Sequence, residues 1–338
     1  MVQAMNMNKW KQELIATPQV KAMPVMTYPA LELTGLSILD VVTKGANQSK
    51  LVEALAARYP SAAAVTMMDL SVEAEAFGAE IRFSEDEIPT AVGAVVTDLA
   101  SAEALRAPEV GEKRTGEYVL GMGASAKAIQ DRPVFGGCIG PFSLAGRLLD
   151  INKAILATMR TPEIVHAVLE KCCTFLAQYM SAIKASGADG VIMAEPLAGL
   201  LSPAGCTEFS SQYVRRLVAA VQDENFVICL HNCGNTTKLV SSMASTGAGM
   251  LHFGNSIKMV DNAPQVPADV VFCGNVDRAG IFRVGAPEQV AERTLDLLND
   301  MKPYKNFMLS SGCDIPPKSP LANVDAFFAT LERFNQGV

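Results

Sequence analysis

A histidine and a cysteine stand two residues apart in LHNCGN, residues 230–235, at the end of an apolar run. A third soft donor, Cys313, follows far downstream in SSGCDIPP, residues 310–317. Side chains two positions apart on an extended chain point the same way, with Cα atoms roughly 6.5–7 Å apart. A metal ion with ligand bonds of about 2.0–2.3 Å can therefore bridge His231 and Cys233. The pattern predicts half of a metal site, which Cys313 would complete.

The donor set itself indicates which metal would bind. One imidazole and two thiolates leave one position of a tetrahedral zinc ion free, which is typical of catalytic zinc rather than structural zinc. Magnesium and calcium prefer oxygen ligands. The alternative is that Cys233 and Cys313 are small buried residues and that His231 is a hydrogen-bonded histidine at the end of a strand. The spacing by itself leaves both interpretations open.

Two carboxylates also follow apolar runs. Glu195 comes directly after GVIMA, residues 190–194, and Asp277 follows the run at 269–274. Glu195 is a candidate to fill the free position on the metal or to orient a proton, and the alternative is a solvated carboxylate. Asp277 is a similar candidate, with helix capping as its alternative.

The remaining histidines and most of the remaining cysteines are expected to have structural roles. His166 is expected on the polar face of a helix, and His252 as a hydrogen-bonded histidine of the core. Packing is the expected role of the cysteines at apolar positions, because a free cysteine behaves as a small apolar residue. These are Cys138, Cys172, Cys206, Cys229 and Cys273.

The candidate ligands must be positioned by elements that recur along the chain. Short runs that are apolar at nearly every position alternate with helical stretches, as in parallel strands covered on both faces. Eight such runs predict an α/β fold, a (β/α)8 TIM barrel, with a doubly wound sheet as the alternative. In a barrel, the ends of the fifth and eighth strands open on the same rim. The runs are residues 23–28, 62–68, 133–138, 190–194, 226–230, 249–253, 269–274 and 306–310.

Two regions lie outside this repeat. Residues 1–20 predict an N-terminal helical lead-in. Residues 72–131 are too long for one connection and predict an insertion after the second strand, with an extra strand pair near GAEIRFSEDEIPTAVG. No internal repeat or linker divides the chain, so one barrel domain over residues 1–338 is expected.

Composition narrows the classes of function. The 338 residues are 49% hydrophobic and 19% charged, with a net charge of −7, and no basic run is present. Nucleic-acid binding is therefore not expected, because phosphate contacts need clustered lysine and arginine. The N-terminal segment lacks the apolar stretch of a signal peptide, and no run approaches the ~18 apolar residues of a membrane span. The protein is expected in the cytoplasm, where its eight cysteines would be thiols or metal ligands rather than disulfides.

Several longer segments resemble a known family. ADGVIMAEPLAGLLSPAGCTEF, VVFCGNVDRAGIF and FMLSSGCDIPPKSPLANVDAF resemble the uroporphyrinogen decarboxylase superfamily. LHNCGN together with the late SGCDIP, and DLSVEAEAFGAEIRF at residues 69–83, resemble its branch of corrinoid-dependent methyltransferases, which includes methylcobalamin:coenzyme M methyltransferases. The likeness covers nearly the whole chain.

This resemblance implies a (β/α)8 barrel in which His231, Cys233 and Cys313 hold Zn²⁺. It also implies transfer of a methyl group between a methylated corrinoid and a thiol such as coenzyme M. The corrinoid would be methylcobalamin or would be carried by a small corrinoid protein. A metal-independent lyase similar to uroporphyrinogen decarboxylase, a zinc hydrolase and a non-enzymatic barrel that binds corrinoid or zinc are the alternatives. The lyase would need arginines near the N-terminus to hold a polycarboxylate, yet no arginine precedes Arg58.

Overall fold

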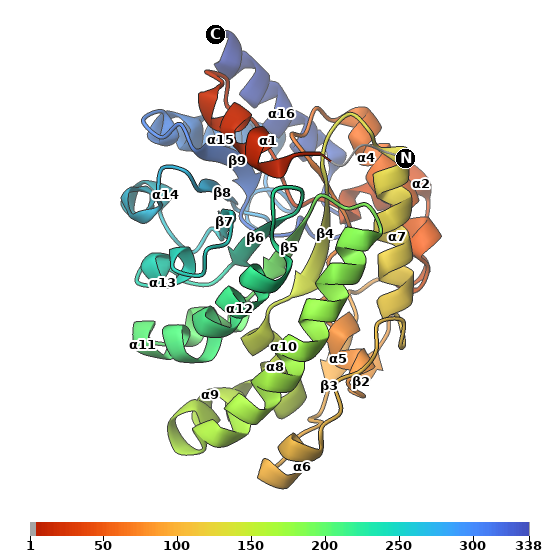
Figure 1. Ribbon diagram of the computed structural model, residues 1–338. Coiled ribbons are helices and arrows are strands. Elements are labelled where there is room, and N and C mark those ends of the chain that lie inside the picture. Colours follow the sequence, from red (N-terminus) through yellow and green to blue (C-terminus); the bar gives the residue numbers. More distant parts are fainter. Residues whose placement is uncertain (1–4, 338) are drawn as a thin grey trace.

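The computed structural model describes residues 5–337 and shows a curved parallel sheet surrounded by helices (Figure 1). The strands lie in the order β1-β4-β5-β6-β7-β8-β9, and each pairs in parallel with the next. A doubly wound sheet would reverse its order at a switch point, so the predicted barrel topology is confirmed. The strands of this sheet are β1 (Ala64–Val65), β4 (Val134–Ile139), β5 (Gly190–Ala194), β6 (Val227–Asn232), β7 (Met250–Phe253), β8 (Val271–Val276) and β9 (Phe307–Ser311).

The first predicted strand, residues 23–28, is not a regular strand. Pro24 has no N–H group to donate, which interrupts a ladder of hydrogen bonds, and an isolated parallel bridge joins Ala22 to Leu309 of β9. The segment nevertheless bonds to both edges of the sheet. The N–H of Met23 donates to the Leu309 carbonyl, and the chain just before β1 donates to the Ala22 carbonyl. It therefore occupies the eighth position and joins β9 to β1.

The other seven predicted strands match observed strands to within a few residues. The helix α10 (Pro162–Ala185) begins with proline in its first turn, where a missing N–H costs little. Pro203 and Pro287 begin α11 and α15, whereas Pro320 is the N-cap of α16. No helix within residues 5–337 is both long and apolar enough to cross a membrane. The other helices are α1 (Met7–Ala16), α2 (Leu31–Thr34), α3 (Ile38–Thr43), α4 (Gly45–Arg58), α5 (Val72–Ala76), α6 (Leu99–Ala104), α7 (Thr115–Ala128), α8 (Pro141–Leu149), α9 (Ile151–Arg160), α11 (Pro203–Cys206), α12 (Gln212–Val221), α13 (Val240–Ala244), α14 (Met259–Asn262), α15 (Pro287–Met301) and α16 (Leu321–Gln336).

The helical lead-in is confirmed as α1, although residues 1–4 of the predicted segment lie outside the described part of the chain. Figure 1 shows α1, in red, across the end of the sheet where the strands begin. Met7 is fully buried, and the ring of Trp10 lies 5.9 Å from the ring of Phe135 on β4. The helix therefore covers the N-terminal end of the barrel and leaves the opposite rim for a site.

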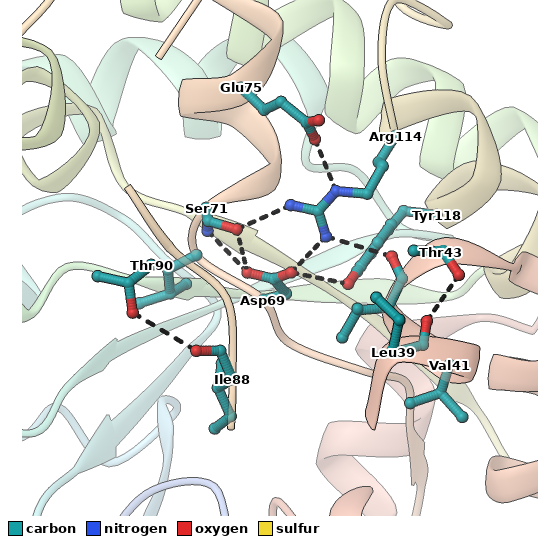
Figure 2. A network of polar contacts seen from close by, with 12 residues as sticks. Leu39, Val41, Thr43, Asp69, Ser71, Glu75, Ile88, Thr90, Arg114 and Tyr118 are labelled. Atoms are coloured by element: carbon teal, nitrogen blue, oxygen red, sulfur yellow. Dashed lines mark hydrogen bonds and ion pairs between the residues drawn. The ribbon is translucent and has the colours of Figure 1, made fainter. Parts of the chain in front are cut away.

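The insertion at 72–131 contains the predicted strand pair, formed by β2 (Glu80–Arg82) and β3 (Thr90–Val92) in antiparallel pairing. Arg114, which precedes α7, connects this insertion to the segment that follows β1 (Figure 2). Its guanidinium lies 2.6 Å from carboxylate oxygens of both Asp69 and Glu75, and donates to the hydroxyl of Ser71. The side chains of Arg114 and Asp69 are 8% and 0% exposed. Because both partners are buried, loss of either one would leave an uncompensated charge in the interior, which loss of a partner from a surface pair does not do.

Replacing Arg114 with methionine is expected to destabilise the protein strongly, because Asp69 would keep a buried charge without its partner. Loss of one member of a buried pair costs about 3–5 kcal/mol in the free energy of unfolding. Arg106→Met is the matched control, since the Arg106–Glu112 pair lies on the surface of the same insertion, and little change is expected. Chemical denaturation of the two variants would measure the difference, and equal stabilities would contradict the assignment.

Candidate metal centre

The alternation of side chains along β6 directs His231 into the barrel. Val227 and Cys229 belong to an apolar cluster inside the ring of strands, whereas Ile228 and Leu230 pack with the surrounding helices. Successive side chains of a strand point to opposite faces, so His231 continues the inner row. It is 2% exposed. The imidazole therefore lies within the barrel, near the rim where the strands end.

Cys233 and Cys313 follow the ends of β6 and β9, and both are partly buried. The ligand atoms of His231, Cys233 and Cys313 all lie within 4.8 Å of one another. Nε2 of His231 is 3.3 Å from Sγ of Cys313. The structure thus brings together the three side chains that the sequence singled out as a metal site.

Two local features hold the loop after β6 in place. The side-chain amide of Asn232 donates to the carbonyl of Glu195, and its Oδ1 accepts from the N–H of Gly234. Gly254, after β7, packs directly on the backbone of Cys233, where an added Cβ would lie 2.5 Å from the Cys233 Cα. Glycine is therefore required at position 254 for this close approach, which fixes the position of Cys233.

The two thiols interact with each other. The proximity of Cys313, together with burial, raises the pKa of Cys233 to about 12. The proximity of Cys233 lowers the pKa of Cys313, and the positive charge of Arg278 adds to this effect. Cys313 is therefore the sulfur that ionises first. A metal ion would displace the remaining proton, since thiols bind metals as thiolates.

The three donors fit zinc. A tetrahedral ion with bonds of about 2.0–2.3 Å needs ligand atoms a few ångström apart, which agrees with their mutual separation of less than 4.8 Å. Nδ1 of His231, the nitrogen that faces away from Cys313, lies 3.3 Å from the carbonyl oxygen of His252. A ligand histidine usually bonds to a carbonyl or a carboxylate through its other nitrogen. The surroundings of His231 are therefore those of a metal ligand.

His252 is a core histidine, as expected from its place in a strand run, but its partners could not be foreseen. It faces His231 directly, with their Nδ1 atoms 2.8 Å apart, and its Nε2 lies 2.8 Å from Oγ of Ser310. Burial holds the pKa of His252 well below its usual range, so its ring is neutral. The pairing of His231 with His252 across β6 and β7 places the two rings side by side.

The structure places the carboxylate of Glu195 outside the group of ligand atoms. Its two oxygens accept from the backbone N–H groups of Phe142 and Ser143 at the start of α8, and one also accepts from the hydroxyl of Ser210. The residue is 2% exposed, and burial raises its pKa while these hydrogen bonds oppose the shift. The carboxylate thus accepts hydrogen bonds at the N-terminal end of α8, where the positive end of the helix dipole favours an anion.

Asp277 follows β8 and holds a turn. Its Oδ1 accepts from the N–H groups of Ala279 and Gly280, and its carbonyl accepts from the N–H of Phe282. Asp277 thus stabilises a turn rather than capping a helix, since the next helix, α15, begins only at Pro287. The sequence offers Arg278, the neighbour of Asp277, as a possible cation for an anionic thiol, and the charge of Arg278 acts on Cys313 and Asp314. Burial raises the pKa of Asp314 to about 8, and Arg278 opposes this shift.

The other candidate residues lie apart from the metal group. His166, on α10, is half-buried rather than fully exposed, and its Nδ1 lies 2.8 Å from the hydroxyl of Tyr213. Cys173 of α10 is buried. The cysteines that were expected to pack are buried as well, and they are Cys138, Cys172, Cys206, Cys229 and Cys273.

Comparison with known proteins agrees with this fold. The methylcobamide:CoM methyltransferase MtbA of Methanosarcina acetivorans is 28% identical over 319 residues, which cover 93% of this chain and 92% of that protein. The uroporphyrinogen decarboxylase of Desulfotalea psychrophila is 26% identical over 274 residues, which cover 78% and 79%. The solved structure of a methyltransferase from Methanosarcina mazei has a TM-score of 0.87 and 21% identity, and the match covers 98% of this chain and 99% of that one.

The family model described as uroporphyrinogen decarboxylase (URO-D) matches residues 11–334. The relatives named above are enzymes of two kinds, methyltransferases and decarboxylases, and the matches to both extend over most of this chain. Because the family model spans nearly the whole sequence, the protein belongs to the uroporphyrinogen decarboxylase family.

Proposed function

We propose that this protein is a zinc-dependent methyltransferase that moves a methyl group between a methylated corrinoid and a thiol such as coenzyme M. The observation that carries this proposal is the convergence of His231, Cys233 and Cys313 on one point of the rim. Support also comes from the methylcobamide:CoM methyltransferase of Methanosarcina acetivorans, which is similar over 93% of this chain. The corrinoid would be free methylcobalamin or would be presented by a small corrinoid protein.

In the proposed reaction, the sulfur of the thiol attacks the methyl carbon. A new C–S bond replaces the Co–C bond, and both electrons of the broken bond remain on cobalt, which leaves as cobalt(I). The obstacle is that a free thiol with a pKa near 8.5 is mostly protonated at neutral pH, and only the thiolate is a good nucleophile. Zinc held by His231, Cys233 and Cys313 would bind that sulfur and lower its pKa.

The three protein ligands determine how reactive such a site can be. Cys233 and Cys313 contribute two negative charges, which offset the charge of the metal and leave the incoming sulfur electron-rich. His231 contributes none, so the fourth position remains available to an anion. In this proposal Glu195 and Asp277 hold α8 and the turn after β8 rather than taking part in the reaction, because their oxygens already accept backbone N–H groups.

Arg278 is the cation that would favour an acidic acceptor. It lies close enough to Cys313 and Asp314 for its charge to lower the pKa of each. An anionic thiol such as coenzyme M, with its sulfonate group, would gain from a positive charge at this distance. A neutral thiol would not.

Metal content is expected to depend on Cys313. Wild-type protein should purify with or take up about one zinc ion per chain, as one site with three protein ligands implies, and Cys313→Ala should lose it because two protein ligands hold zinc poorly. Cys172→Ala, which removes a buried thiol of α10, should retain the metal. Elemental analysis of the three proteins would measure this. Full zinc content in Cys313→Ala would contradict the assigned role.

Methyl transfer is expected to require both metal and thiol. Addition of coenzyme M to methylcobalamin and the zinc-loaded protein should convert the methylcobalamin spectrum to that of the demethylated corrinoid. Chelation should stop the reaction and added zinc should restore it. Arg278→Gln should raise KM for coenzyme M more than KM for 2-mercaptoethanol. Absence of thiol-dependent demethylation with any thiol of a panel, in protein shown to contain zinc, would contradict the proposal.

A decarboxylase is the second candidate, because the family model and the Desulfotalea psychrophila relative carry that name. That activity would release carbon dioxide from a carboxylate substrate and would persist after chelation. The sequence offers little to bind a polycarboxylate near its N-terminus, since its first arginine is Arg58, and that side chain pairs with Asp325. The methyltransferase is therefore favoured.

A further inference from the structure

His231 is connected to a buried backbone carbonyl through two intervening side chains. Its Nδ1 lies 2.8 Å from Nδ1 of His252, whose Nε2 lies 2.8 Å from Oγ of Ser310. The Ser310 hydroxyl lies 2.7 Å from the carbonyl oxygen of Met23. His252 and Ser310 are fully buried and His231 is nearly so. These four residues form one series of hydrogen bonds inside the barrel.

The direction of every bond in the series follows from the one group that cannot donate. The Met23 carbonyl oxygen only accepts, so the O–H of Ser310 must point to it. A hydroxyl has a single proton, so Oγ of Ser310 then accepts from the Nε2–H of His252. Only one of the two facing Nδ1 atoms can carry the proton between them, and Nδ1 of His231 also faces the His252 carbonyl oxygen, which only accepts. The proton is therefore on Nδ1 of His231, and the bare Nδ1 of His252 accepts from it.

A second contact agrees with this direction. Nδ1 of His231 also lies 3.3 Å from the carbonyl oxygen of His252, another atom that can only accept. With two acceptors around it, Nδ1 of His231 keeps its proton. The lone pair of His231 is then on Nε2, which faces Sγ of Cys313 at 3.3 Å. A neutral imidazole binds a metal through such an unprotonated nitrogen.

We infer that His252 and Ser310 are positioning residues that fix His231 in its Nδ1-protonated tautomer before any metal binds. The inference rests on the proposed metal site and extends it from the ligands to the groups that orient one of them. The three inner side chains come from three strands, β6, β7 and β9, and the last acceptor is Met23 in the segment that joins β9 to β1. Closure of the barrel therefore also determines which nitrogen of His231 is free.

The tautomers can be measured directly, because the sequence contains only three histidines. In protein labelled with ¹⁵N-histidine, long-range correlations between ring nitrogens and carbon-bound ring protons identify the protonated nitrogen of each ring. In metal-free wild-type protein we expect His231 to be protonated at Nδ1 and His252 at Nε2. Protonation of His231 at Nε2 would overturn the inference, and that result requires neither metal nor a variant.

Ser310→Ala removes the hydroxyl that orients His252. We expect His231 in this variant to populate both tautomers, and the dissociation constant for zinc to rise roughly 10- to 100-fold, as measured by competition with a chromophoric chelator. Ser311→Ala is the matched control, because the neighbouring hydroxyl accepts from the N–H of Val25 and lies outside the series. It should keep the wild-type tautomers and zinc affinity.

The outcomes separate this inference from the proposed function. Wild-type tautomers and wild-type zinc affinity in Ser310→Ala would overturn the positioning role. Wild-type protein that shows the expected tautomers yet binds no zinc would support the hydrogen-bond series and contradict the proposed function. Zinc binding with a loss of affinity in Ser310→Ala alone would support both.

Discussion

The approach of the His231 imidazole to the Cys313 sulfur depends on the curvature of the sheet. The two residues are 82 positions apart in the sequence. His231 lies on β6 and Cys313 follows β9, two strands that do not pair with each other. Alternation along β6, β7 and β9 turns His231, His252 and Ser310 to the inside, and the curved sheet then brings them into contact. The segment around Met23 completes the ring and also supplies the carbonyl that ends their hydrogen-bond series. The backbone segment that completes the barrel therefore also takes part in orienting the side chains of the site.

The rim uses its polar side chains in two ways. Glu195 and Asp277 follow the ends of β5 and β8, but their oxygens accept backbone N–H groups and so hold a helix and a turn. The sulfur atoms of Cys233 and Cys313 and the Nε2 of His231 remain directed toward one another. The donors left for a ligand are therefore soft, as zinc–thiolate chemistry requires. This division favours transfer to sulfur over chemistry that depends on a carboxylate base.

Much of the fold could be predicted from the sequence because parallel strands covered on both faces are apolar at nearly every position. The segment at 23–28 is the exception, and Pro24 was the signal that a regular ladder would fail there. The grouping of His231, Cys233 and Cys313 was predictable once a barrel was assumed. The contact of His252 with His231 was not, since a continuous apolar run does not reveal which side chains point inward. The backbone partners of the Glu195 carboxylate lie more than 50 residues away in α8, and local sequence carries no signal for such a contact.

The central claim is that one imidazole nitrogen and two sulfurs hold a zinc ion with a position free for a thiol. X-ray absorption at the zinc edge tests it most directly. The spectrum of the wild-type protein should fit two sulfur ligands and one histidine nitrogen, with the remaining ligand a light atom. Addition of coenzyme M should replace that light atom with a third sulfur. A zinc ion bound by nitrogen and oxygen alone, or a first shell that does not change with thiol, would contradict the account.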